Sequence, residues 1–365
     1  MTIRKTINKP GFLRAAAICA AVALGLGASA QAMAAFKVGI MMPTQNEDRW
    51  NNEGSKLRDA AAAAGLEPDL YFGGDDDIPI QQKQIPRLVK DGKNAIVIAP
   101  IDGDALSEQL AEVKSNGVPV ISYDRLIMKS DAVTYYATFD NRKAGVIQGQ
   151  AIERALDLPN ASPDNPKTIE FFAGSERDNN SKFFWDGAME VLQPYLDSGV
   201  LTCPSGQVTL HDCAIDKWSD DIAMKRMDSL IGKQGYKPDG TGKQHLDAIY
   251  SSADILTGGI LVALKNHGYK AGVMPVITGQ DAKPETLKEI LDGEVTMTVF
   301  KDPDLLVDRV VQMLKSISEG KEVEVNDTKT YDNGAGFVKT YQCEPVEINK
   351  DNLKKLLIDT GKIKI

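Results

Sequence analysis

The sequence predicts an α/β protein with two lobes, each built on a doubly wound parallel sheet. Short β-branched runs alternate with amphipathic helical stretches from residue 37 onward. Strands separated by single helices imply right-handed crossovers and a parallel sheet with helices on both faces. About 330 residues follow the expected leader, which exceeds the usual size of a single core, and so many strands would make one sheet unusually wide. Two lobes are therefore expected.

The expected strands are short runs rich in Val, Ile, Tyr and Phe, and the expected helices carry apolar residues at helical spacing. In chain order, the strands lie at residues 37–42, 69–72, 95–99, 120–123, 134–139, 168–172, 248–251, 273–278 and 296–299. The helices between them lie at about residues 51–64, 81–90, 105–116, 143–156, 183–197 and 220–231. No Pro-rich or Ser-rich linker separates the lobes, so short strand-like crossings are expected at Tyr135–Asn141 and at Gly279–Asp281.

The first 34 residues have the pattern of a secretory signal peptide. Four basic side chains precede an apolar run over residues 15–27, and Ala32-Met33-Ala34 supplies the small residues expected before a cleavage site. We therefore expect cleavage near Ala34 and a soluble protein of the periplasm. Removing the leader changes the formal net charge from −9 to −13 by removing four positive charges. This acidity argues against binding to nucleic acid or to an anionic membrane surface.

Two of the cysteines lie close together in a segment rich in Pro, Gly and Thr. In an oxidising compartment Cys203 and Cys213 are expected to form a disulfide, with Cys343 left free. The alternative is three buried thiols, as in a cytoplasmic protein.

Motifs for catalysis or metal binding are missing from the sequence. The three histidines are scattered without metal-ligand spacing, and there is no zincin motif, P-loop or G-x-S-x-G elbow. The acidic run Asp75-Asp76-Asp77 lacks the spacing of a calcium loop, so it is interpreted as a solvated loop or a helix cap. We expect no catalytic residue, metal or cofactor. A secreted sugar-acting enzyme stays open as an alternative, because carboxylates are plentiful and a pair could be hidden among them.

Polar side chains instead follow the expected strands, where an open α/β sheet binds its ligand. They are Arg49-Trp50, Asp124-Arg125, Asp178-Asn179-Asn180, Asp254 and Gln280-Asp281. Carboxylates, amides and guanidinium groups together can satisfy the hydroxyls of a neutral polyol, and Trp50 or Trp218 could pack on the C–H face of a sugar ring. The alternative for Asp124 and Arg125 is a salt bridge that caps the next loop.

With these segments the chain resembles periplasmic sugar-binding proteins of the ribose-binding (type I) superfamily, over essentially its whole length after the leader. Within that group it is most similar to the xylose-binding and multiple-monosaccharide-binding (ChvE-type) receptors of ABC importers. The segments that carry the resemblance are Arg49-Trp50, residues 123–127, residues 135–141, residues 178–180, residues 278–282 and residues 326–331.

The resemblance implies a sugar held in a cleft between two lobes that are joined by a three-segment hinge. The first lobe would comprise residues 36–138 and 282–327, and the second residues 139–281 and 328–365. Implied substrate-binding residues are Arg49, Trp50, Asp124 and Arg125 from the first lobe and Asn180, Trp218, Asp254 and Gln280 from the second. For Asp254 the alternative is a helix cap, and for Gln280 it is a supporting role in the hinge. Trp50 and Trp218 could instead be core aromatics, and Asn179 rather than Asn180 could be the ligand.

The implied function is an extracytoplasmic receptor that takes an aldopentose or aldohexose to an ABC permease without chemistry, as a monomer. A role in chemotaxis or sensor signalling, through a chemoreceptor or sensor kinase, stays open. One departure concerns Ser229, where the related receptors carry Asn in the pocket. The shorter hydroxyl of Ser229 would leave room for water or a larger substituent, so the identity of the sugar cannot be copied from those receptors, and the insertion that holds Cys203 and Cys213 could reshape the rim of the pocket.

Overall fold

The structure is a computed structural model that describes residues 35–74 and 77–364. The expected signal peptide, and Asp75 and Asp76 of the acidic run, lie outside these residues. Asp77 caps a helix, as one of the two interpretations of the acidic run expected: its carboxylate accepts a hydrogen bond from Ile80 N at 3.1 Å. Within the described ranges, no helix is both long and apolar enough to cross a membrane.

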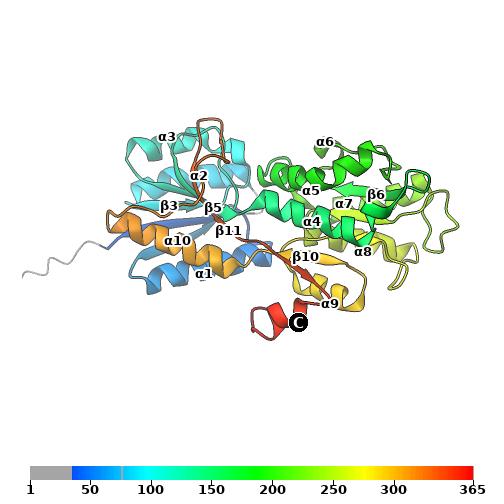
Figure 1. Cartoon of the computed structure of the whole chain (residues 1–365). Coiled ribbons are helices and arrows are strands. Elements are labelled where there is room, and N and C mark those ends of the chain that lie inside the picture. Colours follow the sequence, from blue (N-terminus) through cyan, green and yellow to red (C-terminus); the bar gives the residue numbers. More distant parts are fainter. Residues whose placement is uncertain (1–34, 75–76, 365) are drawn as a thin grey trace, which may run out of the picture. The chain divides into compact units, whose positions relative to one another are not determined.

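The first lobe is built on a six-stranded parallel sheet (Figure 1). Its strands, in spatial order, are β11 (Lys339–Cys343), β5 (Val133–Phe139), β4 (Val120–Tyr123), β3 (Ala95–Ile98), β1 (Lys37–Met42) and β2 (Glu67–Phe72). The central strands β1, β3 and β4 are buried almost throughout. Strands buried on both faces are continuous apolar runs, which is why the sequence pattern located them.

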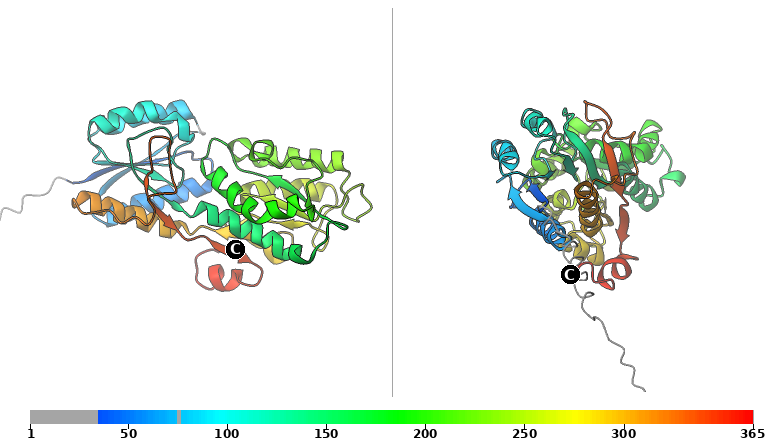
Figure 2. Two further views of the ribbon diagram at one scale, coloured as in Figure 1. Left: turned by 45° about the horizontal axis from the view of Figure 1, so that its top comes forward. Right: turned by 90° about the vertical axis from the view of Figure 1, so that its left-hand side faces the viewer.

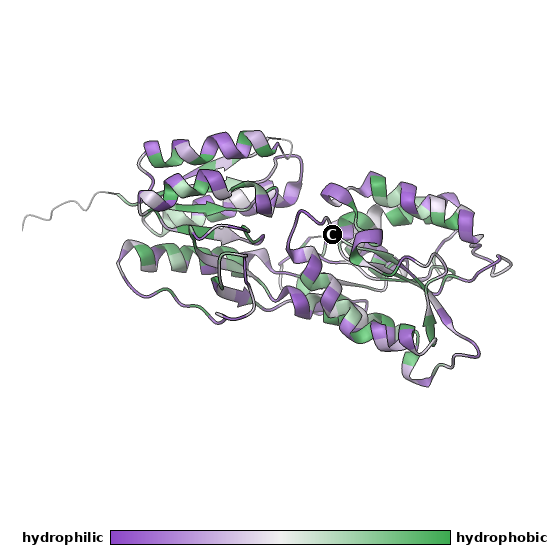
Figure 3. Ribbon diagram, turned by 90° about the horizontal axis from the view of Figure 1, so that it is seen from above, coloured by the Kyte–Doolittle hydropathy of each residue, from purple (hydrophilic) through white to green (hydrophobic). Residues whose placement is uncertain are grey.

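Helices cover both faces of this sheet. On one face α1 (Asp48–Ala63) and α10 (Pro303–Ser318) pack against Ile40, Val97 and Ile121. On the other face α2 (Ile78–Lys90) and α3 (Ser107–Ser115) pack against strand residues that include Ile96 and Ile98. Figure 3 shows the pattern of these amphipathic helices, with apolar and polar stripes along each one.

The second lobe has a four-stranded parallel sheet in the order β7 (Leu201–Thr202), β6 (Lys167–Phe172), β8 (Ala248–Ser251) and β9 (Val276–Ile277). A parallel bridge between Gln280 and Val299 extends this layer to β10 (Met297–Phe300), which pairs antiparallel with β12 (Val346–Asn349). The remaining helices of the lobe are α4 (Asn141–Ala155), α5 (Asn180–Asp197), α6 (Leu210–Cys213), α7 (Asp220–Gln234), α8 (Asp254–Asn266) and α9 (Pro284–Asp292).

Helices α4 and α5 lie side by side (Figure 2). Glycines permit this close packing: a Cβ on Gly145 would lie 2.0 Å from the Phe184 carbonyl oxygen, and one on Gly187 would lie 2.0 Å from that of Arg142. The N-terminus of α5 is thereby held close to the end of β5, where the chain leaves the first lobe.

The predicted fold class, α/β with two doubly wound lobes, is confirmed by these sheets. The first crossing follows β5, near the expected Tyr135–Asn141. The other two differ from expectation: the chain leaves the second lobe after β10, near Lys301, and returns to it between β11 and β12. Residues 282–300 therefore belong with the second sheet, and residues 339–343 with the first, opposite to the expected assignment. The reason is nonlocal pairing, since Gln280 and Val299 are joined across α9 and β11 pairs with β5.

The expected disulfide is also absent, because Cys203, Cys213 and Cys343 are all free thiols. The sulfurs of Cys203 and Cys213 each donate to the Gln207 carbonyl oxygen, at 3.5 and 3.2 Å, instead of joining. Burial raises the pKa of the Cys203 thiol to about 11 and that of Cys213 to about 12, so both are protonated near neutral pH.

Candidate functional site

Arg49 and Asp124 form the centre of a buried charge cluster at the carboxyl ends of β1 and β4. Arg49 lies in the first turn of α1, where its Nη2 is 3.1 Å from Asp124 Oδ1 and its Nε donates to Glu53 Oε1 at 2.7 Å. The second Glu53 oxygen accepts a hydrogen bond from Tyr123 at 2.7 Å. Asp124 is 2% exposed, and besides its ion pair with Arg49 its Oδ1 has no hydrogen-bond donor within the described residues. That oxygen is thus able to accept a bond from a ligand hydroxyl.

Trp50 does not present an open ring face as predicted. Its side chain is 1% exposed, and its ring centroid lies 4.6 Å from the Arg49 guanidinium carbon and 5.0 Å from that of Arg125. Cation–π contacts with both arginines therefore occupy the indole. In this arrangement Trp50 supports the two guanidinium groups, and its Nε1 has no hydrogen-bond partner among the described residues.

Arg125 reaches from the first lobe to the second. Its Nε lies 3.2 Å from Asp178 Oδ2, and its Nη1 donates to the Pro100 carbonyl oxygen at 3.3 Å. Both partners of this interlobe ion pair are largely buried, with side chains 12% and 7% exposed. The pair therefore connects the carboxyl end of β4 with the loop that precedes α5.

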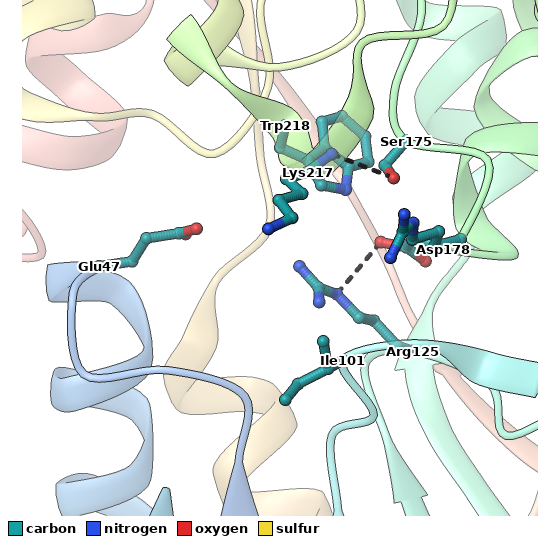
Figure 4. A pocket seen from close by; sticks show the side chains of 8 residues that line it. Glu47, Ile101, Arg125, Ser175, Asp178, Lys217 and Trp218 are labelled. Carbon is teal, nitrogen blue, oxygen red and sulfur yellow. Dashed lines mark hydrogen bonds and ion pairs between the residues drawn. The ribbon is translucent and has the colours of Figure 1, made fainter. Parts of the chain in front are cut away.

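A small pocket with a cavity volume of about 30 Å³ lies between the lobes beside this ion pair (Figure 4). It is lined by Glu47, Ile101, Arg125, Ser175, Arg177, Asp178, Lys217 and Trp218. Of the eight predicted substrate-binding residues, Arg125 and Trp218 line this pocket directly. Trp218 is 9% exposed, and its Nε1 has no hydrogen-bond partner in the described part of the chain. Trp218 therefore offers the pocket an aromatic surface and a free donor, as the aromatic partner of a sugar requires.

A strained turn holds Trp218 in place. Lys217 and Trp218 have φ angles of 56° and 55°, in the left-handed region that residues with a Cβ seldom adopt. Gly174 makes room for the indole, because a Cβ there would lie 2.1 Å from Trp218 Cη2. Figure 4 shows the Lys217 side chain directed toward the space between Glu47 and Arg125.

Gln280 and Asp254 both lie at the second lobe's edge. They differ in whether their side-chain oxygens already accept hydrogen bonds from the protein. Gln280 is 1% exposed, and its Oε1 lacks a hydrogen-bond partner among the described residues. Both carboxylate oxygens of Asp254 are already occupied, one by Thr298 Oγ1 and the other by Lys283 N, each at 2.8 Å. Asp254 thus ties the start of α8 to β10 and to the start of α9.

Asn180 is similarly engaged with the protein. Its Nδ2 donates to the Asp124 carbonyl oxygen at 2.8 Å, and its Oδ1 accepts from Asn141 Nδ2 at 2.9 Å. The amide is 1% exposed. Its placement does bring it next to Asp124, as the sequence predicted, but through the main chain of that residue.

Sequence reasoning missed Lys301, which lies at the second crossing between the lobes. Its ammonium group is 3.0 Å from Asp281 Oδ1 and lies over the rings of Phe184 and Phe139, at 5.3 and 6.0 Å. Asp281 also lies 3.8 Å from Arg49 Nη1. A single Lys after a strand carries little signal, and only the folded chain brings it to these carboxylates.

Ser229 does not belong to the site. It lies on the exposed face of α7, and it does not line the pocket, so the expected effect on sugar choice has no structural basis. The prediction was wrong because it transferred a position along a helix without knowing which face of α7 points inward.

The charges of the cluster alternate in sign. Burial would raise the pKa of Asp124, but Arg49, Lys301 and Arg125 outweigh it and hold that pKa below its ordinary value. Lys301 and Arg49 do the same for the pKa of Asp281 against its burial. For Asp254, burial outweighs the bonds from Lys283 and Thr298 and raises the pKa well above the ordinary value. Cations and carboxylates are thus largely paired with one another, which suits an uncharged ligand rich in hydroxyl groups.

The described residues contain no group of three or more His, Cys, Asp or Glu side chains that could hold a metal ion. The polar atoms of the cluster and pocket are carboxylate, amide, guanidinium, ammonium, hydroxyl and indole groups. This set forms hydrogen bonds in both directions, as the recognition of hydroxyl groups demands.

Comparisons with known proteins agree with this architecture. Residues 38–322 match the family model described as a periplasmic binding protein domain. The multiple sugar-binding periplasmic receptor ChvE of Rhizobium radiobacter is 44% identical over 349 residues, which cover 94% of this chain and 96% of that protein. The D-xylose-binding periplasmic protein of Escherichia coli is 29% identical over 325 residues, covering 89% of this chain and 90% of that one.

A solved structure is similar over the same range. An ABC transporter solute-binding protein from Clostridium phytofermentans, crystallised with bound β-D-glucose, is 44% identical and superimposes with a TM-score of 0.84. The match covers 90% of this chain and 98% of that one. These relatives are binding proteins and receptors, and the resemblance expected from the sequence is confirmed. The chain belongs to the periplasmic binding protein family, in its type I, sugar-binding group.

Proposed function

We propose that this protein is the extracytoplasmic receptor of an ABC-type importer, which binds a monosaccharide in the cleft between its lobes and delivers it to the membrane permease. The observation that carries the proposal is the convergence of both lobes on one polar pocket, joined by the Arg125–Asp178 ion pair. Beside it lie buried polar atoms on Asp124, Trp218 and Gln280 that have no hydrogen-bond partner in the described ranges. Such atoms are costly to bury unless a ligand satisfies them.

The balance of charge supports a neutral sugar. Arg49 and Lys301 each lie within ion-pair distance of a carboxylate of the cluster, as does Arg125. Trp218 supplies a flat surface at the pocket wall, and Asp124 and Gln280 supply hydrogen-bond acceptors. The sugar-binding receptors that resemble this chain over nearly its full length support the same substrate class.

The direct ligands that the structure favours are Asp124, Arg125, Trp218 and Gln280. Arg49 and Trp50 would hold Asp124 and Arg125 in position, and Asp254 would tie α8, α9 and β10 together at the second lobe's edge. The proposed location is the periplasm, in keeping with the relatives' names and the expected signal peptide. A signalling role would rest on the family resemblance alone.

A panel of aldopentoses and aldohexoses tests this function. Thermal unfolding is followed with each sugar in excess, since a ligand that binds only the folded state raises the melting temperature. At least one monosaccharide should raise it in a saturable way, and chromatography should recover that sugar unchanged. Turnover of the sugar would instead establish the enzyme alternative, and a panel without any shift would contradict the receptor.

A further inference from the structure

The turn formed by residues 178–180 holds the Asp124-Arg125 pair from the opposite lobe. Asn180 Nδ2 donates to the Asp124 carbonyl oxygen at 2.8 Å, and Asp178 Oδ2 lies 3.2 Å from Arg125 Nε. The turn itself is braced, because Asp178 Oδ1 accepts from Asn180 N at 3.0 Å. One short segment of the second lobe thus contacts both residues of the first-lobe pair.

Asp124 has a backbone conformation that requires such support. Its φ angle is 58°, in the left-handed region, although it has a Cβ. Its N–H donates to the Ala137 carbonyl oxygen at 2.8 Å, and its own carbonyl oxygen lies 2.6 Å from the Tyr136 hydroxyl and 3.0 Å from Thr138 Oγ1. With Asn180 Nδ2, three donors therefore surround one carbonyl oxygen. Because both peptide groups of Asp124 are held in this way, the Cα–Cβ bond from which its carboxylate extends has a fixed direction.

The opposite end of the Asn180 amide is also engaged. Its Oδ1 lies 2.9 Å from both Asn141 Nδ2 and the Tyr136 hydroxyl. Asn141 is the first residue of α4, just after the first crossing between the lobes, and it is fully buried. An amide that is 1% exposed and bonded at both ends is a connector between protein segments, and little of it is left for a sugar.

We propose that the 178–180 turn is an interlobe clasp that aims the Asp124 carboxylate and the Arg125 guanidinium group at the sugar, with Asn180 acting through Asp124 as a positioning residue. This inference rests on the proposed sugar-binding function. Asn180 was predicted to bind the sugar directly, and the two roles make different predictions about how its effect depends on Asp124.

A double-mutant cycle on the full chain separates the two roles. Binding of D-glucose is measured by calorimetry for the wild type, Asn180→Ala, Asp124→Asn and the double variant, with Asn165→Ala as the matched control. Asn165 is exposed, and its side chain makes no hydrogen bond among the described residues. Loss of the Asn180 donor removes one of the three hydrogen bonds to the Asp124 carbonyl oxygen and should weaken binding about five- to tenfold in the wild type, the usual effect of one lost hydrogen bond. In the Asp124→Asn background the same change should cost less than about threefold, because the aimed carboxylate is already gone.

Equal factors in the two backgrounds would overturn the proposal, because they would show that Asn180 acts independently of the Asp124 carboxylate. Hydrogen exchange of residues 120–127 without sugar supplies a second measurement. Asn180→Ala should speed exchange there relative to both the wild type and Asn165→Ala, and unchanged exchange would also overturn the clasp. If the wild type binds no sugar of the monosaccharide panel, the proposed function fails, and exchange alone decides on the clasp.

Discussion

Replacing Asp124 by Asn is the sharpest test of how the site recognises a hydroxylated ligand. The amide has nearly the same shape as the carboxylate, so the change removes charge and one acceptor without opening a cavity. Asp124 is 2% exposed and lies 3.1 Å from Arg49. At an effective dielectric constant of about 20, two charges at this distance attract each other by about 5 kcal/mol before the cost of desolvation.

The net effect on stability should be much smaller. Breaking a buried ion pair generally costs about 3–5 kcal/mol. Arg49, however, keeps Glu53 at 2.7 Å and Asp281 at 3.8 Å, and a quarter of its side chain is exposed. We therefore expect the free energy of unfolding to fall by about 1–2 kcal/mol. Affinity for a sugar should fall more, by about 10- to 150-fold, because a hydrogen bond to a charged group contributes about 1.5–3 kcal/mol.

Calorimetry with the best sugar of the panel measures the affinity, and urea denaturation measures the stability. Asp164→Asn is the matched control, because Asp164 is exposed and its side chain has no ion pair or hydrogen bond among the described residues. An Asp124→Asn protein that binds the sugar as tightly as the control would refute the assignment of Asp124 as a ligand. A loss of stability beyond about 4 kcal/mol would instead show that the remaining partners do not compensate Arg49.

Other changes test the surroundings of the pocket. Gly174→Ala should displace the Trp218 indole, because the added Cβ would lie 2.1 Å from it, and should weaken sugar binding and shift tryptophan fluorescence; an unchanged spectrum would contradict this packing. Asp281→Asn should lower the free energy of unfolding by about 3 kcal/mol in urea, since it leaves the Lys301 ammonium buried, whereas the combination with Lys301→Met should recover part of the loss. Asp254→Ala should cost about 1–3 kcal/mol by leaving Lys283 N and Thr298 Oγ1 without their acceptor, and a neutral effect would show that water replaces it. The pKa values of Asp124 and Asp281 lie below the ordinary 3.8. Their contribution to the free energy of unfolding should therefore be complete above that pH and lost as the pH falls through the folded-state pKa. Arg49→Gln should make the free energy of unfolding fall less steeply with decreasing pH.

Much of the fold was predictable because its core strands carry local signals. The runs Lys37–Met42 and Ala248–Ser251 were located without error, since continuous apolar segments of this length are typical of buried parallel strands. Strands β11 and β12 were not found. They mix polar and apolar residues and are defined by pairing with β5 and β10, which are distant in the sequence. The lobe boundaries were misplaced for the same reason.

For the site, the sequence located the right strand ends but not the roles of the side chains. The pattern assigned Asp124, Arg125, Trp218 and Gln280 to the cleft. In the structure Arg125 and Trp218 line the pocket, and Asp124 and Gln280 each have a buried oxygen without a hydrogen-bond partner among the described residues. The sequence pattern could not show that two guanidinium groups pack on Trp50. It also could not show that the side chains of Asp254 and Asn180 form hydrogen bonds with other groups of the protein. Such roles depend on which group each polar atom bonds to in the folded chain, and that group usually comes from another segment.

Some polar atoms near the lobe crossings are bonded within the protein, and others have no hydrogen-bond partner there. This difference explains how two lobes can share one ligand. Near the lobe crossings, Asp254 and Asn180 have their polar atoms bonded to other segments, and Lys301 is paired with Asp281. Asp124, Trp218 and Gln280 each retain a buried polar atom without a hydrogen-bond partner in the described part of the chain. A ligand that bonds to residues of both lobes binds most tightly when the lobes are held at one fixed separation. The residues whose polar atoms are bonded within the protein set that separation. Affinity in this protein should therefore depend on residues that never touch the sugar as strongly as on those that do.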